Sequence, residues 1–135
     1  MPKLYRSREG SSTAVDTKAQ MTTLGSQAAP GPLQVPAGAT ELLGVITAFG
    51  CDLGIAADGT IFVRLEGNGL PEGPETLTIG AVGAAVATGG LHTTAAMYTP
   101  LHAKVTPGNE ISLFHENDGE DMNVITTGVT LVFAV

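Results

Sequence analysis

The densest group of side chains able to do chemistry is a run of carboxylates toward the C-terminal part of the sequence. It consists of Glu116, Asp118, Glu120 and Asp121. Hard cations such as Ca²⁺ are bound by carboxylate oxygens that a short loop supplies, so this run is the best candidate for a metal site. The spacing is not that of an EF-hand, and a solvated turn, or an ion-pairing partner for a basic segment of a neighbouring molecule, accounts for the same residues. We therefore expect no bound metal, with these four carboxylates as weak candidates.

The three histidines do not form a recognisable zinc motif. His92, His102 and His115 are ten and thirteen positions apart, whereas zinc sites use closely spaced pairs together with a third ligand. The single cysteine, Cys51, cannot form a disulfide bond within the chain and is expected in the core as a small apolar residue. These residues therefore predict no cofactor.

Signatures of nucleophilic catalysis and of phosphate binding are missing from the sequence. Ser112 lies in a predicted strand without the glycines of a nucleophile elbow. The stretch Gly67-Asn68-Gly69 is not followed by the Lys-Ser or Lys-Thr pair of a phosphate-binding loop, and we interpret it as a turn. We therefore expect that the protein is not an enzyme.

Charge is distributed unevenly along the sequence. Residues 1–34 carry a net charge of +2 and residues 35–135 carry −9, which together give −7. An acidic body is poorly suited to direct binding of nucleic acid. Charged residues make up 14% of the chain, against about 25% in ordinary globular domains, so we expect other subunits to cover much of the surface.

Residues 1–32 are predicted to form an extended N-terminal arm. They are rich in small and polar residues, they sustain no apolar period of 2 or 3.6, and they end in a proline-rich run that excludes a helix there. Isolated apolar and basic residues in this arm are spaced as anchors and electrostatic guides for a partner. The predicted partner-binding residues are Leu4, Tyr5, Arg6, Arg8, Val15, Lys18, Met21 and Leu24.

Residues 33–135 are predicted to form one all-β domain. Short runs with alternating apolar residues are separated by turns rich in glycine and proline. Strands are expected at residues 41–49, 60–66, 75–79, 93–98, 101–105, 110–115 and 124–135. The glycine-rich stretch 80–90 is open between a strand and a packed loop, and Gly83 disfavours a helix there. Seven or eight short strands predict an antiparallel, jelly-roll-like β-sandwich.

A short internal echo suggests two corners of such a sandwich. The segments Val35-Pro36-Ala37-Gly38 and Val105-Thr106-Pro107-Gly108 each precede a predicted strand. Proline fixes one φ angle and glycine permits a positive one, so both segments are expected to be tight turns at equivalent positions of the two halves.

Four segments of residues 33–135 carry a resemblance to known proteins: Val35–Phe49, Ile61–Gly69, Val105–Leu113 and Gly128–Phe133. In these segments the chain resembles small β-sandwich and jelly-roll virion proteins, in particular the capsid decoration (cement) proteins of tailed phages. The resemblance implies a structural protein that binds a capsid lattice, with its arm running over neighbouring subunits and its copies forming a homotrimer or another homo-oligomer. The implied partners are the major capsid protein lattice and copies of the chain itself, with no membrane and no direct contact to nucleic acid. The implied location is the virion, after synthesis in the host cytoplasm.

Two other functions remain open at the level of the sequence. A major shell-forming capsid protein of the single jelly-roll type would combine the same sandwich and arm. A glycan- or Ca²⁺-binding β-sandwich module would use the acidic run, although the chain has no tryptophan and only two tyrosines to stack on a sugar ring. No apolar segment of a secretory signal is visible in the first residues, which favours synthesis without export.

Overall fold

The fold is an antiparallel β-sandwich, as the sequence predicts. The computed structural model describes residues 2–12, 19–21, 31–53, 58–70, 77–85, 90–93, 96–117 and 122–135. These residues contain strands and no helix, and hence no helix able to cross a lipid bilayer. The strands are β1 (Lys3–Ser12), β2 (Ala19–Gln20), β3 (Leu33–Gln34), β4 (Glu41–Leu53), β5 (Asp58–Glu66), β6 (Leu77–Ala85), β7 (Gly90–Thr93), β8 (Met97–Lys104), β9 (Glu110–Asn117) and β10 (Met122–Ala134). Strands β2 and β3 have two residues each, which leaves eight longer strands.

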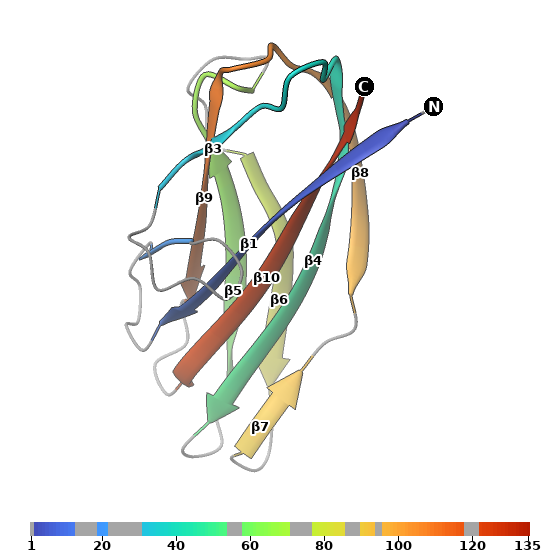
Figure 1. The fold of residues 1–135 in the computed structure, drawn as a ribbon. Coiled ribbons are helices and arrows are strands. Elements are labelled where there is room, and N and C mark those ends of the chain that lie inside the picture. Colours follow the sequence, from blue (N-terminus) through green and yellow to red (C-terminus); the bar gives the residue numbers. More distant parts are fainter. Residues whose placement is uncertain are drawn as a thin grey trace.

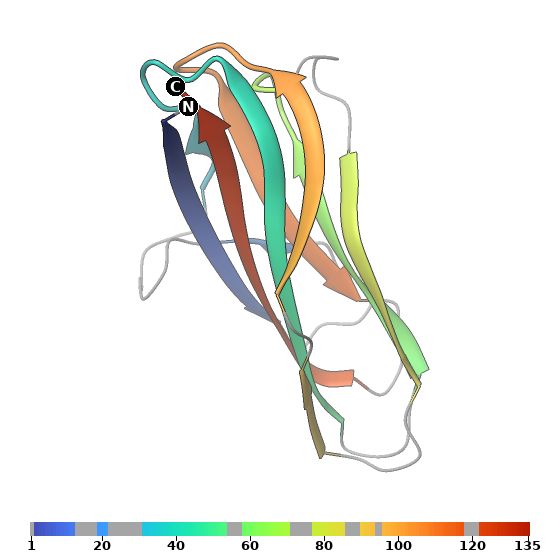
Figure 2. The same ribbon diagram turned by 90° about the vertical axis from the view of Figure 1, so that its right-hand side faces the viewer.

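The strands form two sheets that lie one behind the other (Figure 1). The first sheet has the order β1-β10-β4, and the far edge of β4 is shared by β8, along its first half, and β7, along its second half. The second sheet has the order β6-β5-β9, and the far edge of β9 is shared by the short strands β2 and β3. The two layers are seen from the side in Figure 2.

The core fills the space between the sheets because apolar side chains alternate along the longer strands. Val129, Leu131 and Phe133 of β10 are buried on one side, and Ile111 and Leu113 of β9 belong to the same cluster. Further buried members from the other described strands and loops are Leu33, Val35, Ala39, Leu42, Val45, Phe49, Val63, Leu65 and Leu70. Burial of this surface is the main driving force for folding.

Two parts of the N-terminal segment lie on the sandwich itself. Residues 3–12, which the sequence places in an extended arm, form β1 and pair with β10 along their whole length, from Lys3 opposite Ala134. Met21 is completely buried in the core between the sheets. Its amide donates a hydrogen bond to the carbonyl of Leu113 at 2.8 Å. The described residues of this segment therefore contact the chain's own sheets.

The two proline–glycine segments are turns, as predicted, and they contact each other. Gly38 and Gly108 have φ angles of +81° and +85°, which glycine adopts without steric cost. The amide of Gly108 donates to the carbonyl of Val35 at 3.0 Å, and the amide of Val35 donates to the carbonyl of Asn109 at 2.8 Å. The two turns therefore close the same end of the sandwich.

Several predicted strand limits are wrong, and two of these differences have a clear physical reason. Separate strands are predicted at 93–98 and 101–105, with Pro100 between them, but the single strand β8 runs through Pro100. It can do so because β8 lies at a sheet edge, where the missing N–H of proline is tolerated. Asp58 and Gly59 precede the strand predicted at 60–66 and form a pair that favours a turn, but both lie in β5 opposite Ala85 and Ala84 of β6. Pairing with a neighbouring strand overrides the local turn preference there.

Candidate interaction edge on the N-terminal strand

Strand β1 forms one edge of the first sheet. One side of β1 pairs with β10, and no described strand pairs with its other side. An edge strand presents unpaired N–H and C=O groups and is a template for pairing with another chain. The far side of β1 is therefore the leading candidate for an interaction surface.

The side chains of β1 form two rows, because successive residues of a strand point to opposite faces of the sheet. The inward row consists of Leu4, Arg6, Arg8 and Gly10, which stand opposite Phe133, Leu131, Val129 and Thr127 of β10. The outward row consists of Lys3, Tyr5, Ser7 and Glu9. Leu4 packs against the core, whereas Ser7 Oγ and Thr130 Oγ1 share a hydrogen bond of 2.7 Å. Two arginines thus occupy positions of the inward row, although the residues opposite them on β10 belong to the core.

Both arginines of the inward row donate to the backbone of β1. Arg6 Nη1 donates to the carbonyl oxygen of Tyr5 at 3.0 Å, and Arg8 Nη1 donates to the carbonyl oxygen of Ser7 at 2.9 Å. The pKa of Arg8 is lowered from its ordinary value, first by partial burial and second by the positive charge of Arg6. The two guanidinium groups therefore lie close enough to repel each other.

The outward face of the first sheet carries a small apolar cluster next to this edge. Its members are Leu43, Ile46, Val132 and Ala134. Tyr5 stands in register with Val132, and the ring of Tyr98 lies over Gly44, where an added Cβ atom would come within 2.6 Å of the ring. Both tyrosines remain about half exposed, at 54% and 53%. This face thus presents two aromatic rings to solvent, Tyr5 on the edge strand β1 and Tyr98 on β8 beyond β10 and β4.

A buried histidine joins the two sheets beneath the end of β1. His115 of β9 is 1% exposed, and its Nδ1 lies 3.1 Å from Thr127 Oγ1 of β10. Gly10 of β1 packs directly on the ring, since an added Cβ atom would come within 2.7 Å of Nε2. Sequence reasoning missed this contact, although a polar residue at an inward position of a predicted strand was the available signal. His115 therefore links β9, β10 and β1.

The burial of His115 predicts a loss of stability in mild acid. Burial lowers its pKa below the ordinary 6.5, so between that lowered value and about 6.5 the unfolded chain binds more protons than the folded one. The free energy of unfolding is therefore expected to be constant above about pH 6.5 and to fall as the pH drops below it. Urea titrations at pH values from 8 down to 5 measure how the free energy of unfolding changes with pH. This range was chosen because it lies above the ordinary carboxylate pKa values of about 4.

The matched variant for the pH experiment is H115Q, whose amide can still hydrogen-bond Thr127. The free energy of unfolding of H115Q is expected to be lower than that of the wild type at pH 8. Unlike that of the wild type, it is expected to stay constant between pH 6.5 and 5. His102 is 66% exposed at its side chain and remains in both proteins, so it acts as an internal control. An identical slope in wild type and H115Q would show that His115 does not cause the pH dependence.

The acidic run is only partly described, and one of its members has a local partner. Glu116 Oε1 lies 3.4 Å from Arg64 Nη2 of β5 on the outer face of the second sheet. Asp118, Glu120 and Asp121 lie outside the described residues. Among the residues that the structure describes, no three His, Cys, Asp or Glu side chains gather closely enough to hold a metal ion.

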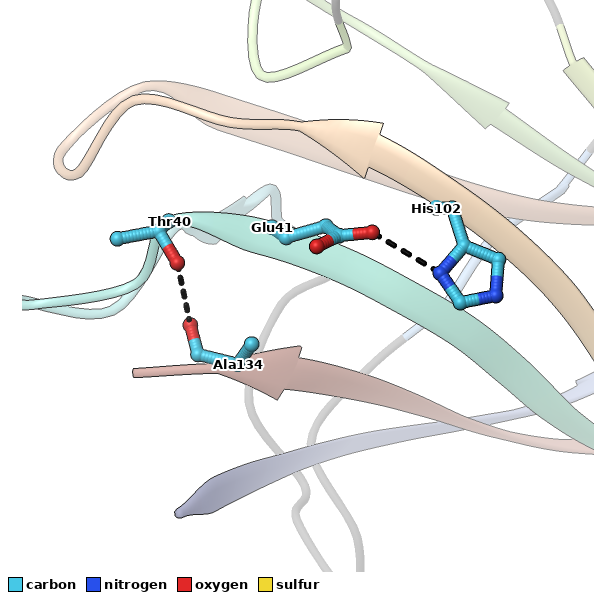
Figure 3. Close-up of polar contacts among 4 residues, drawn as sticks. All are labelled: Thr40, Glu41, His102 and Ala134. Atoms are coloured by element: carbon cyan, nitrogen blue, oxygen red, sulfur yellow. Dashed lines mark hydrogen bonds and ion pairs between the residues drawn. The ribbon is translucent and has the colours of Figure 1, made fainter. Parts of the chain in front are cut away.

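The other two histidines lie far apart along the first sheet. His102 of β8 has a φ angle of +55°, at a register irregularity opposite Leu42 and Gly44, and its Nδ1 lies 3.0 Å from Glu41 Oε1 (Figure 3). This exposed pair contributes little to stability, because solvent screens it. His92 of β7 stands in backbone register with Cys51 of β4, whose side chain lies outside the described residues.

Near the Glu41–His102 pair, polar contacts also join the two termini of the chain. Thr40 Oγ1 donates to the carbonyl of Ala134 at 3.5 Å, next to the Glu41–His102 pair (Figure 3). The amide of Val135 donates to the carbonyl of Pro2 at 3.2 Å. The start of β1 is therefore fixed at the corner where β10 ends.

The predicted anchors of the N-terminal segment fall into three groups. Tyr5, Arg6 and Arg8 are exposed or half-buried on β1, and Leu4 packs partly against the core. Met21 is fully buried within the chain and presents no surface to a partner. Val15, Lys18 and Leu24 lie outside the described residues.

Comparison with protein-family models and with curated proteins found no match to this chain.

Proposed function

We propose that the protein is a structural assembly protein that decorates or cements a viral capsid shell. The observation that carries this proposal is β1, a ten-residue strand at a sheet edge with its far side uncovered by any described strand. Subunits of a shell must make lateral contacts, and an edge strand offers backbone hydrogen bonds for such contacts.

The charge distribution supports the same role. β1 carries Lys3, Arg6 and Arg8 against Glu9, whereas residues 35–135 carry a net charge of −9. A basic edge on an acidic body favours ordered contacts with acidic neighbours, including other copies of the chain. Many copies on one lattice multiply individually weak contacts. The partners in this proposal are the major capsid protein lattice and copies of the chain, and the location is the virion.

The test is whether the chain travels with particles. Particles from the natural source of the chain are sedimented on a density gradient, and each fraction is probed with an antibody raised against the purified protein. We expect the protein in the fractions that contain capsids, and immunogold label on the outer surface of intact particles. Recovery of the protein only from particle-free fractions would contradict the proposal.

Expression of the chain by itself separates decoration from shell formation. Small oligomers in sedimentation velocity and no shells in electron micrographs are expected for a decoration protein. Closed shells formed without any other protein would instead indicate a major capsid protein. A glycan- or Ca²⁺-binding module has less support, because Glu116 of the acidic run pairs with Arg64.

A further inference from the structure

The arginines of β1 shield the edge on which they lie. In an antiparallel strand, alternate residues direct both N–H and C=O toward one neighbour, and the remaining residues direct theirs to the other side. Tyr5 and Ser7 belong to the same alternate set, and their carbonyls accept the bonds from Arg6 and Arg8. We infer that these carbonyls face the free side of β1 and that the guanidinium groups cap them.

The same arginines disfavour pairing of β1 with a second β1. Two copies pair antiparallel about a two-fold axis perpendicular to the sheet, which places each inward row opposite an inward row. If the two-fold axis passes through Arg6, the two copies of Arg6 stand opposite each other, and an axis through Arg8 does the same for Arg8. An axis through Ser7 places Arg6 of one copy opposite Arg8 of the other. Like charges directly opposite each other are destabilising. The edge is therefore suited to a strand of different sequence.

We propose that the free edge of β1 is an arginine-capped docking site for an extended strand that carries carboxylates on alternate residues. The incoming carboxylates bind the guanidinium groups of Arg6 and Arg8, for which paired N–H···O bonds are the favoured geometry. The carbonyls of Tyr5 and Ser7 then accept N–H groups of the new strand. The identity of the natural partner rests on the proposed assembly role. Binding of an acidic strand to β1 can be measured on the isolated chain, so an experiment can contradict either proposal without contradicting the other.

The probe is a short fluorescent peptide in which glutamate alternates with valine, and its counterpart has lysine in place of glutamate. Fluorescence anisotropy is expected to show binding of the glutamate peptide alone. In R6Q/R8Q the affinity for this peptide is expected to fall about tenfold, as two lost charge-assisted contacts imply. K3Q removes a cation from the outward row of the same strand, and its affinity for the glutamate peptide is expected to change less than about twofold.

Amide hydrogen exchange locates the bound peptide. Because the N–H and C=O of one residue point to the same side of an antiparallel strand, the amides of Tyr5 and Ser7 are expected to exchange more slowly when the glutamate peptide is bound. R6K/R8K retains the charges and is expected to bind more tightly than R6Q/R8Q. Equal binding of the two peptides, unchanged affinity in R6Q/R8Q, or protection that excludes Tyr5 and Ser7 would overturn the proposal.

Discussion

Replacement of Met21 by alanine is expected to lower the free energy of unfolding by about 2–5 kcal/mol. The side chain is completely buried in the core between the two sheets. Alanine removes its apolar contacts and leaves a cavity that the surrounding strands fill only in part. Urea denaturation followed by far-ultraviolet circular dichroism measures the loss as a lower transition midpoint.

The control for M21A is K3A, an exposed position of the same N-terminal segment. Its free energy of unfolding is expected to change by no more than about 0.5 kcal/mol. An M21A protein as stable as K3A would mean that the N-terminal segment leaves the core in solution and behaves as a separable arm. The pair of variants therefore tests how much of the segment belongs to the sandwich.

Replacement of Gly67 by alanine is expected to lower the free energy of unfolding by about 3 kcal/mol or more. Gly67 has a φ angle of +123°, which side chains rarely adopt, and a Cβ atom there would come within 2.5 Å of the carbonyl oxygen of Glu110. That carbonyl is fixed, because it accepts the amide of Gly69 at 2.8 Å while the amide of Glu110 donates to Asn68 Oδ1 at 2.9 Å. In G67A the start of β9 must therefore move to make room for the added Cβ atom.

Two other glycines separate the contributions to this effect. Gly38 has a φ angle of +81° but nothing within 4 Å of an added Cβ atom, so G38A is expected to lose only about 1 kcal/mol from backbone strain. Gly128 lies in β10 with open space around the Cβ position, and G128A is expected to be unchanged or more stable by up to about 1 kcal/mol. If G67A lost no more than G38A in the same urea titrations, the contact with Glu110 would not be rigid.

The longer strands of the sandwich could be predicted because they obey simple alternation. Ile61, Val63 and Leu65 recur at every second position, as do Ile111 and Leu113, and both runs lie in strands, β5 and β9. The proline–glycine turns were also predictable, since Gly38 and Gly108 use the positive φ angles that such turns require.

Strand β1 could not be predicted in the same way. Its inward row contains one large apolar residue, Leu4, followed by Arg6, Arg8 and Gly10. Charged residues are tolerated on the inward row because β1 lies at the sheet edge, where their side chains reach solvent. Alternation of apolar residues therefore fails as a signal at this strand, although its neighbour β10 shows it clearly.

The candidate edge shares this limitation, because it depends on contacts between distant segments. The sequence predicts Arg6 and Arg8 as guides for a partner, but their bonds to the carbonyls of Tyr5 and Ser7 depend on the strand conformation. The contact of Gly10 with His115 joins residues more than a hundred positions apart. The alternation of Ile111, Leu113 and His115 indicates that His115 faces inward, but it does not identify Gly10 as its neighbour.

The pairing of β1 with β10 also sets a kinetic problem for the chain. Ser7 and Thr130, which share a hydrogen bond across these strands, are 123 residues apart. Closure of so long a loop costs conformational entropy before any contact compensates for it, and folds dominated by such pairings form in about milliseconds to seconds. Until β1 arrives, β10 is itself an open edge with a hydrophobic inward row. During that interval the β1 strand of another molecule can take the vacant place, so the topology that buries Met21 and seats β1 also provides a route to strand exchange between copies.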